Sequence, residues 1–193
     1  MAFASIAGSN LSAGEPVGAP PAALLLVAVP GWVRLTTATS KSFALQVGSL
    51  LAMVGYVVFW IVQADQTAFL FAAIACIGLG SSALAVLFWS MLPDTVEYGE
   101  WKTGNRAEAK VFGFATFAQK AAVGINALLL GLLLDLSGFR ANRDQAPDTL
   151  FAMEAIMVGI PFLGAMTIAL IARSYRLDKR LHDNIRRELA AHK

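Results

Sequence analysis

The chain contains little charge and almost no cysteine or histidine. Of its 193 residues, 15 are Lys or Arg and 13 are Asp or Glu, whereas about a quarter of the residues of a soluble domain are charged. Cys76 is the only cysteine, which excludes a disulfide or a cysteine-based metal site within one chain. His182 and His192 both lie in the polar C-terminal tail, where solvated surface histidines are expected. This composition excludes a nucleic-acid module, a disordered chain and an ordinary cytosolic enzyme.

The familiar motifs of enzymes are missing as well. No nucleophile elbow, zinc-peptidase helix, phosphate-binding loop or dinucleotide-binding glycine pattern stands in a suitable context. We therefore expect a protein that is not an enzyme and that has no catalytic residues, metal site or bound cofactor.

Long uncharged runs dominate what is present. Hydrophobic residues make up 57% of the chain and the mean hydropathy is +0.62. No charge occurs within 16–33, 42–64, 66–93 or 155–172, and 111–134 is interrupted only by Lys120. A membrane helix needs roughly 17–25 residues. The pattern predicts an all-α, polytopic membrane helix bundle of about five transmembrane helices, at 17–33, 43–63, 66–91, 112–137 and 150–172.

The basic residues indicate the orientation of these spans. With the C-terminus on the cytoplasmic side, the inner segments 34–42, 94–110 and 173–193 hold twelve of the 15 basic residues, and the outer loops hold only Arg140 and Arg143. Such an excess is typical of cytoplasmic loops. We expect a multi-pass protein of the plasma (inner) membrane, with its C-terminus in the cytoplasm.

The two ends of the chain differ in character. Residues 1–16 carry no Lys or Arg and are rich in Gly, Ser and Ala, so they are expected to be an irregular segment, and residues 1–20 to derive from a shifted or internal start that replaces upstream helices. The tail, 173–193, repeats leucine or isoleucine every four residues from Leu177 to Leu189. It is predicted to be a basic amphipathic helix that lies on the membrane, or else a solvated tail that enforces orientation.

One segment between two spans carries a long motif. It runs Leu92-Pro-Asp-Thr-Val-Glu-Tyr-Gly-Glu-Trp-Lys-Thr-Gly104 and is followed by Phe117-Ala-Gln-Lys120. This motif resembles the signature of the glycoside-pentoside-hexuronide:cation symporters, the melibiose-permease-like branch of the major facilitator fold. The resemblance extends more weakly from about Pro30 to the end, and implies that the five spans correspond to helices eight to twelve of a twelve-helix transporter, its C-terminal half.

The resemblance also implies roles for the motif and for what accompanies it. A cytoplasmic gate would contain Asp94, Glu97, Tyr98, Gly99, Glu100, Trp101, Lys102, Gly104 and Arg106. Glu97 replaces the more usual Asp of the family, and Lys110 replaces a small or apolar residue. A coupling ion, Na⁺ or H⁺, is implied, but the family's cation-binding carboxylates lie on N-terminal helices that this chain does not contain. Asp135 and Glu154, near the outer ends of their spans, are expected to be interfacial charges.

The resemblance makes Lys120 the strongest candidate for a site that binds substrate or couples it to the ion. It lies eight residues, or about 12 Å, inside a span that begins near Phe112. An ammonium at that depth is expected to face the bundle interior or an aqueous cavity. Thr116, one turn earlier, shares its helix face; the resemblance implies that it belongs to the same site, and the alternative is a hydroxyl that bonds its own helix backbone. Trp89 can stack on a sugar ring or serve as an interfacial aromatic residue.

Two functions follow as hypotheses. The first is part of a secondary active transporter for a sugar or glycoside with a cation, which works by alternating access, in contact with the lipid bilayer and with a missing N-terminal half. The second is a truncated membrane protein without autonomous transport, which acts as a helix-packing partner or is a non-functional fragment. The sequence does not identify the sugar, the coupling ion or the oligomeric state.

Overall fold

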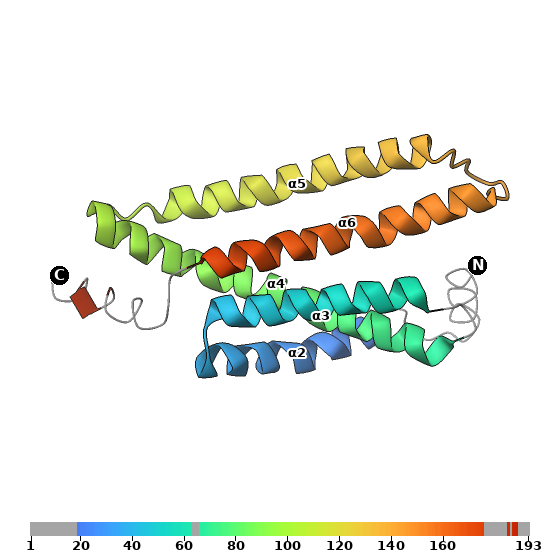
Figure 1. Ribbon diagram of the computed structural model, residues 1–193. Coiled ribbons are helices and arrows are strands. Elements are labelled where there is room, and N and C mark those ends of the chain that lie inside the picture. Colours follow the sequence, from blue (N-terminus) through green and yellow to red (C-terminus); the bar gives the residue numbers. More distant parts are fainter. Residues whose placement is uncertain (1–18, 63–65, 176–184, 186, 189–193) are drawn as a thin grey trace. The chain divides into compact units, whose positions relative to one another are not determined.

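The computed structural model describes residues 19–62, 66–175, 185, 187 and 188, with side chains from Ala28 onward (Figure 1). Five long helices and no strand occur in these ranges: α2 (Ala19–Ala38), α3 (Lys41–Ile61), α4 (Thr67–Thr103), α5 (Glu108–Leu136) and α6 (Pro147–Ser174). The predicted all-α membrane helix bundle is confirmed. The irregular segment 1–16 and most of the tail 173–193 lie outside the described residues.

Helices α3, α4, α5 and α6 are each long and apolar enough to cross a membrane. The remaining expected span, 17–33, overlaps α2, whose first side chains are not described. Large apolar side chains lie on the outside of these helices, among them Phe114 (73% exposed), Ile61 (70%) and Leu136 (82%). Such surfaces are stable only against lipid or further helices. The chain is a multi-pass membrane protein.

Helix α4 continues well beyond the expected span 66–91. It has 37 residues, or about 55 Å at the usual helical rise, against about 30 Å for a hydrocarbon core. Pro93 lies inside it without ending it. The segment 94–110, expected as a loop, is therefore helical up to Thr103 and irregular only at 104–107. Most of its residues, Gly99 included, tolerate a helix, and the helix ends where Gly104 adopts a left-handed backbone (φ +69°).

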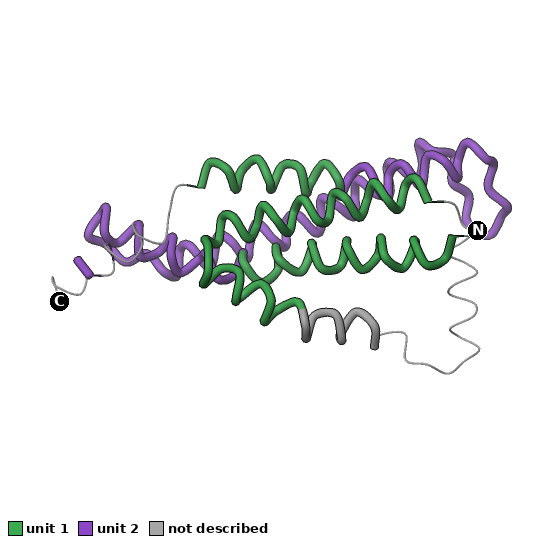
Figure 2. Tube along the Cα trace, turned by 60° about the horizontal axis from the view of Figure 1, so that its bottom comes forward, with its two compact units in different colours: residues 1–87, 162–175 green, residues 88–161, 176–193 purple. Residues whose placement is uncertain are grey.

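The chain divides into two compact units (Figure 2). The first comprises residues 1–87 and 162–175, and therefore α2, α3, the first part of α4 and the last part of α6. The second comprises residues 88–161 and 176–193, with the rest of α4, all of α5 and the beginning of α6. Every residue of the candidate site lies in the second unit.

In the first unit, α3 and α4 approach each other through small residues. A Cβ atom added to Gly80 would lie 2.5 Å from both the amide nitrogen of Ala52 and the carbonyl oxygen of Gly48. One added to Gly48 would lie 2.3 Å from the Cβ of Ala83, and both Ala52 and Ala83 are buried. The two backbones are thus in direct contact, as in the small-residue interfaces of membrane helices.

Polar contacts join further helices in this unit. The indole Nε1 of Trp32, on α2, donates to the Ser82 hydroxyl (3.0 Å) and to the Leu79 carbonyl (3.2 Å), both on α4. The hydroxyl of Ser42, on α3, donates to the Ala172 carbonyl on α6. Because a buried indole N–H needs an acceptor, the Trp32 bonds satisfy the donor and fix α2 against α4.

In the second unit, α5 and α6 are joined by a short structured loop. Gly138 has φ +77°, its N–H bonds the Asp135 carbonyl, and the next N–H, of Phe139, bonds the Leu134 carbonyl. This is a Schellman ending, in which glycine accepts the left-handed backbone. The side chain of Gln145 then bonds the backbone of Arg140 and the carbonyl of Arg143, and so closes the loop.

Candidate functional site

Lys120 lies on the outside of α5, in the most apolar part of that helix. It is twelve residues after Glu108, or about 18 Å along the axis, and its side chain is exposed. It makes no hydrogen bond or ion pair with the residues that the structure describes. No residue of the most apolar 18-residue stretch of α5 is buried, so Lys120 projects from an apolar surface. An ammonium at such a depth needs water or a polar partner.

Thr116 lies one turn before Lys120 on the same face of α5, and it is partly buried where Lys120 is exposed. Its hydroxyl donates to the Phe112 carbonyl (2.8 Å), and the neighbouring Ala115 is buried. This is the backbone bond typical of threonine within a membrane helix. The oxygen keeps its acceptor lone pairs. Thr116 therefore remains able to accept a hydrogen bond from a ligand hydroxyl.

Trp89 lies on α4, four residues before Pro93. Its ring is 43% exposed and meets Phe88 edge to face, with ring centroids 5.5 Å apart. Among the described side chains, it makes no hydrogen bond or ring contact with Thr116 or Lys120. The structure thus leaves Trp89 partly exposed and shows no direct contact between its ring and Thr116 or Lys120.

The two acidic residues that follow Pro93 are turned inward. Asp94 is only 8% exposed, and one carboxylate oxygen of Glu97 is inaccessible to solvent. Both residues take part in interactions. They lie three positions apart and so share one face of α4. A buried carboxylate is stable only when it is hydrogen-bonded or paired with a positive charge. This face of α4 therefore needs polar partners.

The aromatic residues of the motif form a small cluster one turn further on. The Tyr98 and Trp101 rings are 5.9 Å apart at an angle of 43°, and the Lys102 ammonium lies 5.7 Å from the centre of the Tyr98 ring. That distance allows an attraction between the cation and the π-system. These contacts restrict the side chains on one side of the last turn of α4, beyond the apolar part of the helix.

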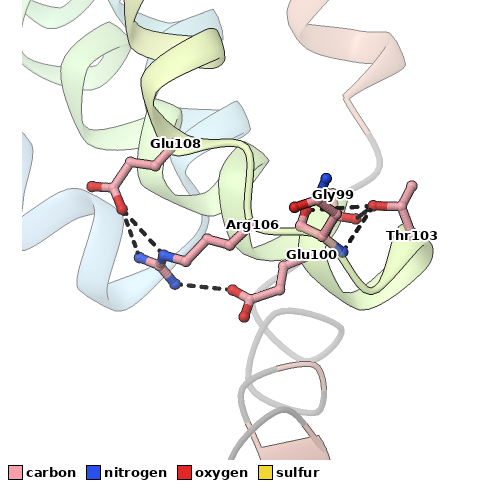
Figure 3. A network of polar contacts seen from close by, with 6 residues as sticks. Gly99, Glu100, Thr103, Arg106 and Glu108 are labelled. Carbon is pink, nitrogen blue, oxygen red and sulfur yellow. Dashed lines mark hydrogen bonds and ion pairs between the residues drawn. The ribbon is translucent and has the colours of Figure 1, made fainter.

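Arg106 connects the end of α4 to the beginning of α5 (Figure 3). Its guanidinium lies 2.9 Å from a Glu100 carboxylate oxygen and 3.1 Å from a Glu108 oxygen. The hydrogen bond with Glu100, followed by the bond and the charge of Glu108, raises the pKa of Arg106 above the ordinary arginine range. Arg106 is thus cationic at every working pH, and its charge is largely neutralised by the two carboxylates.

Gly104 ends α4 and allows this turn to form. It has φ +69°, and its N–H bonds the Glu100 carbonyl (2.8 Å), which is a simple left-handed helix ending. Thr103 supports it through a bond from its hydroxyl to the Gly99 carbonyl (2.7 Å; Figure 3). Gly99 itself lies within the helix with open space beside it. Of the two glycines in the motif, Gly104 is therefore the one required by conformation.

The motif alone does not single out Glu108, although the structure makes it a partner of Arg106. Two signals point to it: it lies two residues after an arginine, and it is the first residue of a helix, where a carboxylate is favoured by the helix dipole. Over the described part of the chain, no three His, Cys, Asp or Glu side chains gather in a way that could hold a metal ion.

Comparison with known proteins gives consistent results. The model of the family described as "MFS/sugar transport protein" matches residues 3–179. The isoprimeverose transporter of Lactiplantibacillus pentosus is 34% identical over 158 residues, which cover 81% of this chain and 33% of that protein. An uncharacterized symporter of Synechocystis is 29% identical over 166 residues, 83% of this chain and 30% of the relative. The glucuronide carrier protein homolog of Escherichia coli is 29% identical over 143 residues, 74% and 30% respectively.

These three relatives are named as a transporter, a symporter and a carrier, and none as an enzyme. The matched residues make up about a third of the length of each relative. The described residues therefore correspond to one portion of a larger transporter architecture.

Proposed function

Because this chain belongs to the MFS/sugar transport protein family, we propose that it forms part of a sugar:cation symporter that works by alternating access. The observation that carries the proposal is the placement of Lys120 and Thr116, an ammonium and a hydroxyl one turn apart within an apolar helix. A membrane helix carries a cation at such a position at a cost of roughly 2.5–3.5 kcal/mol. That cost is consistent with a functional site.

In this proposal Lys120 and Thr116 bind the hydroxyl groups of a sugar or glycoside, and Trp89 covers an apolar face of the ring. The ammonium donates up to three hydrogen bonds and the Thr116 oxygen accepts one. Lys120 also responds to the charge of a coupling ion. Either candidate ion, Na⁺ or H⁺, is a cation and repels the ammonium unless a carboxylate lies between the ion and Lys120. Such carboxylates would come from helices outside this chain, in an N-terminal half.

The motif on α4 would form part of a cytoplasmic gate. Asp94, which is buried, and Glu97, one oxygen of which is inaccessible to solvent, would form its inner side, while Arg106 holds the α4–α5 turn. We place the protein in the plasma (inner) membrane with its C-terminus in the cytoplasm, on the basis of the excess of basic residues in the segments assigned to that side.

Uptake of labelled glycosides tests this function. Cells would express the chain alone, or together with a segment that corresponds to the unmatched part of a relative. We expect saturable uptake that is abolished by an ionophore. The Lys120→Ala variant should show no uptake, whereas the Lys110→Ala variant should transport like the wild type. Lys110 is a matched control, since it is an exposed lysine of the same helix but lies in its first turn.

The bare surface of α5 favours a second candidate, a membrane protein that does not transport by itself and packs against other helices. No residue of the apolar stretch of α5 is buried, although a few are partly covered. If uptake fails under both conditions while the chain co-purifies with the added segment, the second candidate replaces the first.

A further inference from the structure

The C-terminal segment makes a specific contact with the end of α4. The indole Nε1 of Trp101 donates a hydrogen bond of 2.6 Å to a carboxylate oxygen of Glu188. The two residues are 87 positions apart in the sequence and belong to the same compact unit. A short bond to a carboxylate is charge-assisted and stronger than a bond between neutral groups. The contact therefore links the segment to the helix that carries the motif.

A second observation on the same segment supports this contact. Ile185 is 1% exposed and is one of the two largest fully buried side chains in the described part of the chain. Ile185 and Glu188 are both helical, and three residues apart they share a helix face. Arg187, between them, is exposed. Ile185 is thus turned inward as an apolar anchor, while Glu188, itself exposed, bonds Trp101 at the surface of the protein.

Trp101 is suited to receive such a face. It lies in the last turn of α4, eight residues or about 12 Å beyond Pro93, where the uncharged run ends. Its ring is held against Tyr98, and its only polar atom is the N–H donor. In membrane proteins such an N–H usually reaches water or lipid headgroups. Here it is bonded by a carboxylate of the protein itself.

We propose that Ile185 and Glu188 form a latch, which holds the last turn of α4 and thereby the α4–α5 turn in place, and whose release frees both. Glu188 acts as the positioning residue and Ile185 as the anchor. The contact does not depend on any transport activity. Its effect on transport, a slower opening of this end of the protein, rests on the proposed function.

Hydrogen–deuterium exchange of the full chain in lipid nanodiscs tests the latch. The variants are Trp101→Phe, which keeps an aromatic ring but removes the donor, and Glu188→Ala, which removes the acceptor. We expect each to speed exchange in the peptide containing residues 185–188 by about three- to tenfold, after correction for intrinsic rates. The double variant should exchange no faster than the more affected single variant, because both remove the same contact.

Two matched controls complete the experiment. Trp60→Phe makes the same substitution at a tryptophan of similar exposure, 39% against 41%, and Asp144→Asn removes a carboxylate from the exposed α5–α6 loop. Both should leave the peptide unchanged. Unchanged exchange in Trp101→Phe and Glu188→Ala, or additive effects in the double variant, would overturn the latch. A single monodisperse peak on size-exclusion chromatography establishes that each variant is folded. If the wild-type protein shows no glycoside uptake, that result counts against the proposed function and not against the latch.

Discussion

At the scale of single residues, Lys120 stands out because it places a positive charge in the apolar helix α5. Its neighbours on the same helix, Phe117 (68% exposed) and Leu128 (64%), present similar outward surface, but only Lys120 is charged. A charged group in hydrocarbon attracts water or a polar partner. The environment that Lys120 meets in the membrane therefore differs from that of its neighbours.

This difference predicts a pattern of thiol labelling. In a Cys76→Ala background, Lys120→Cys should react with a water-soluble maleimide at least about tenfold faster than Leu128→Cys, because only a thiol in contact with water forms the reactive thiolate. Labelling of membranes followed by a gel-shift assay measures both rates. Equal, slow labelling would place position 120 against lipid and remove the argument for an aqueous site.

Residue-level contacts also show where sequence reasoning stops. The motif identified Glu100 and Arg106, which the structure joins, because both carry charge within a few residues of each other. It did not identify Glu188, which meets Trp101 from 87 residues away. Contacts between distant parts of a chain depend on how helices pack, and one sequence contains no direct record of that packing.

At the scale of helices, the tight approach of α3 and α4 depends on residues without side-chain bulk. Gly78 and Gly80 lie two residues apart on α4, yet a Cβ at Gly78 meets nothing within 4 Å and a Cβ at Gly80 meets backbone atoms at 2.5 Å. Backbone atoms cannot move aside as a flexible side chain can. The two glycines are therefore a matched pair for testing the interface.

We expect Gly80→Ala to destabilise the protein by about 1–3 kcal/mol, the usual cost of overpacking. Gly78→Ala should be neutral or stabilising by up to about 1 kcal/mol, since alanine is the better helix former. Thermal unfolding in detergent, followed by circular dichroism, measures both. A Gly80→Ala protein as stable as the wild type would contradict the direct backbone contact.

The end of α4 offers a second matched pair of glycines. Gly104→Ala should cost about 1–2 kcal/mol, because alanine is disfavoured in the left-handed conformation that Gly104 adopts (φ +69°). Gly99→Ala, inside the helix with open space around it, should stabilise slightly. The same unfolding assay applies, and a neutral Gly104→Ala would show that the turn relaxes to another ending.

The helices themselves were largely predictable, because uncharged runs of membrane-spanning length leave a helix as the main way to satisfy the backbone. The ends were less so. The charges that begin at Asp94 suggested a loop, whereas α4 continues to Thr103. Charge marks where a helix leaves the hydrocarbon, but backbone conformation, here at Gly104, decides where the helix stops.

At the scale of the whole molecule, the orientation of the spans is the property most open to direct test. The segments assigned to the cytoplasm hold most of the basic residues, and the loop between α5 and α6 holds Arg140 and Arg143 together with Asp144. In a Cys76→Ala background, Asp144→Cys should label from outside intact cells with a membrane-impermeant reagent. Asn105→Cys should label only after the cells are broken.

The reverse pattern would invert the orientation and place the α4 motif outside the cell. Equal labelling of both positions in intact cells would mean that this portion of the chain does not adopt one orientation when expressed. The assay reads topology alone and requires no transport, so its result is independent of which sugar or ion the protein handles.

The ion pairs of Arg106 with Glu100 and Glu108 make the α4–α5 turn sensitive to ionic strength. The guanidinium and the Glu108 carboxylate are both about half exposed, so dissolved ions reach them, and the screening length falls from about 10 Å at 0.1 M to about 3 Å at 1 M salt. The bond between the Gly104 amide and the Glu100 carbonyl carries no net charge and is not weakened in this way. Concentrated salt would therefore weaken the Arg106–Glu108 pair more than the Arg106–Glu100 pair, because Glu100 is only 14% exposed, while the backbone of the turn keeps its form.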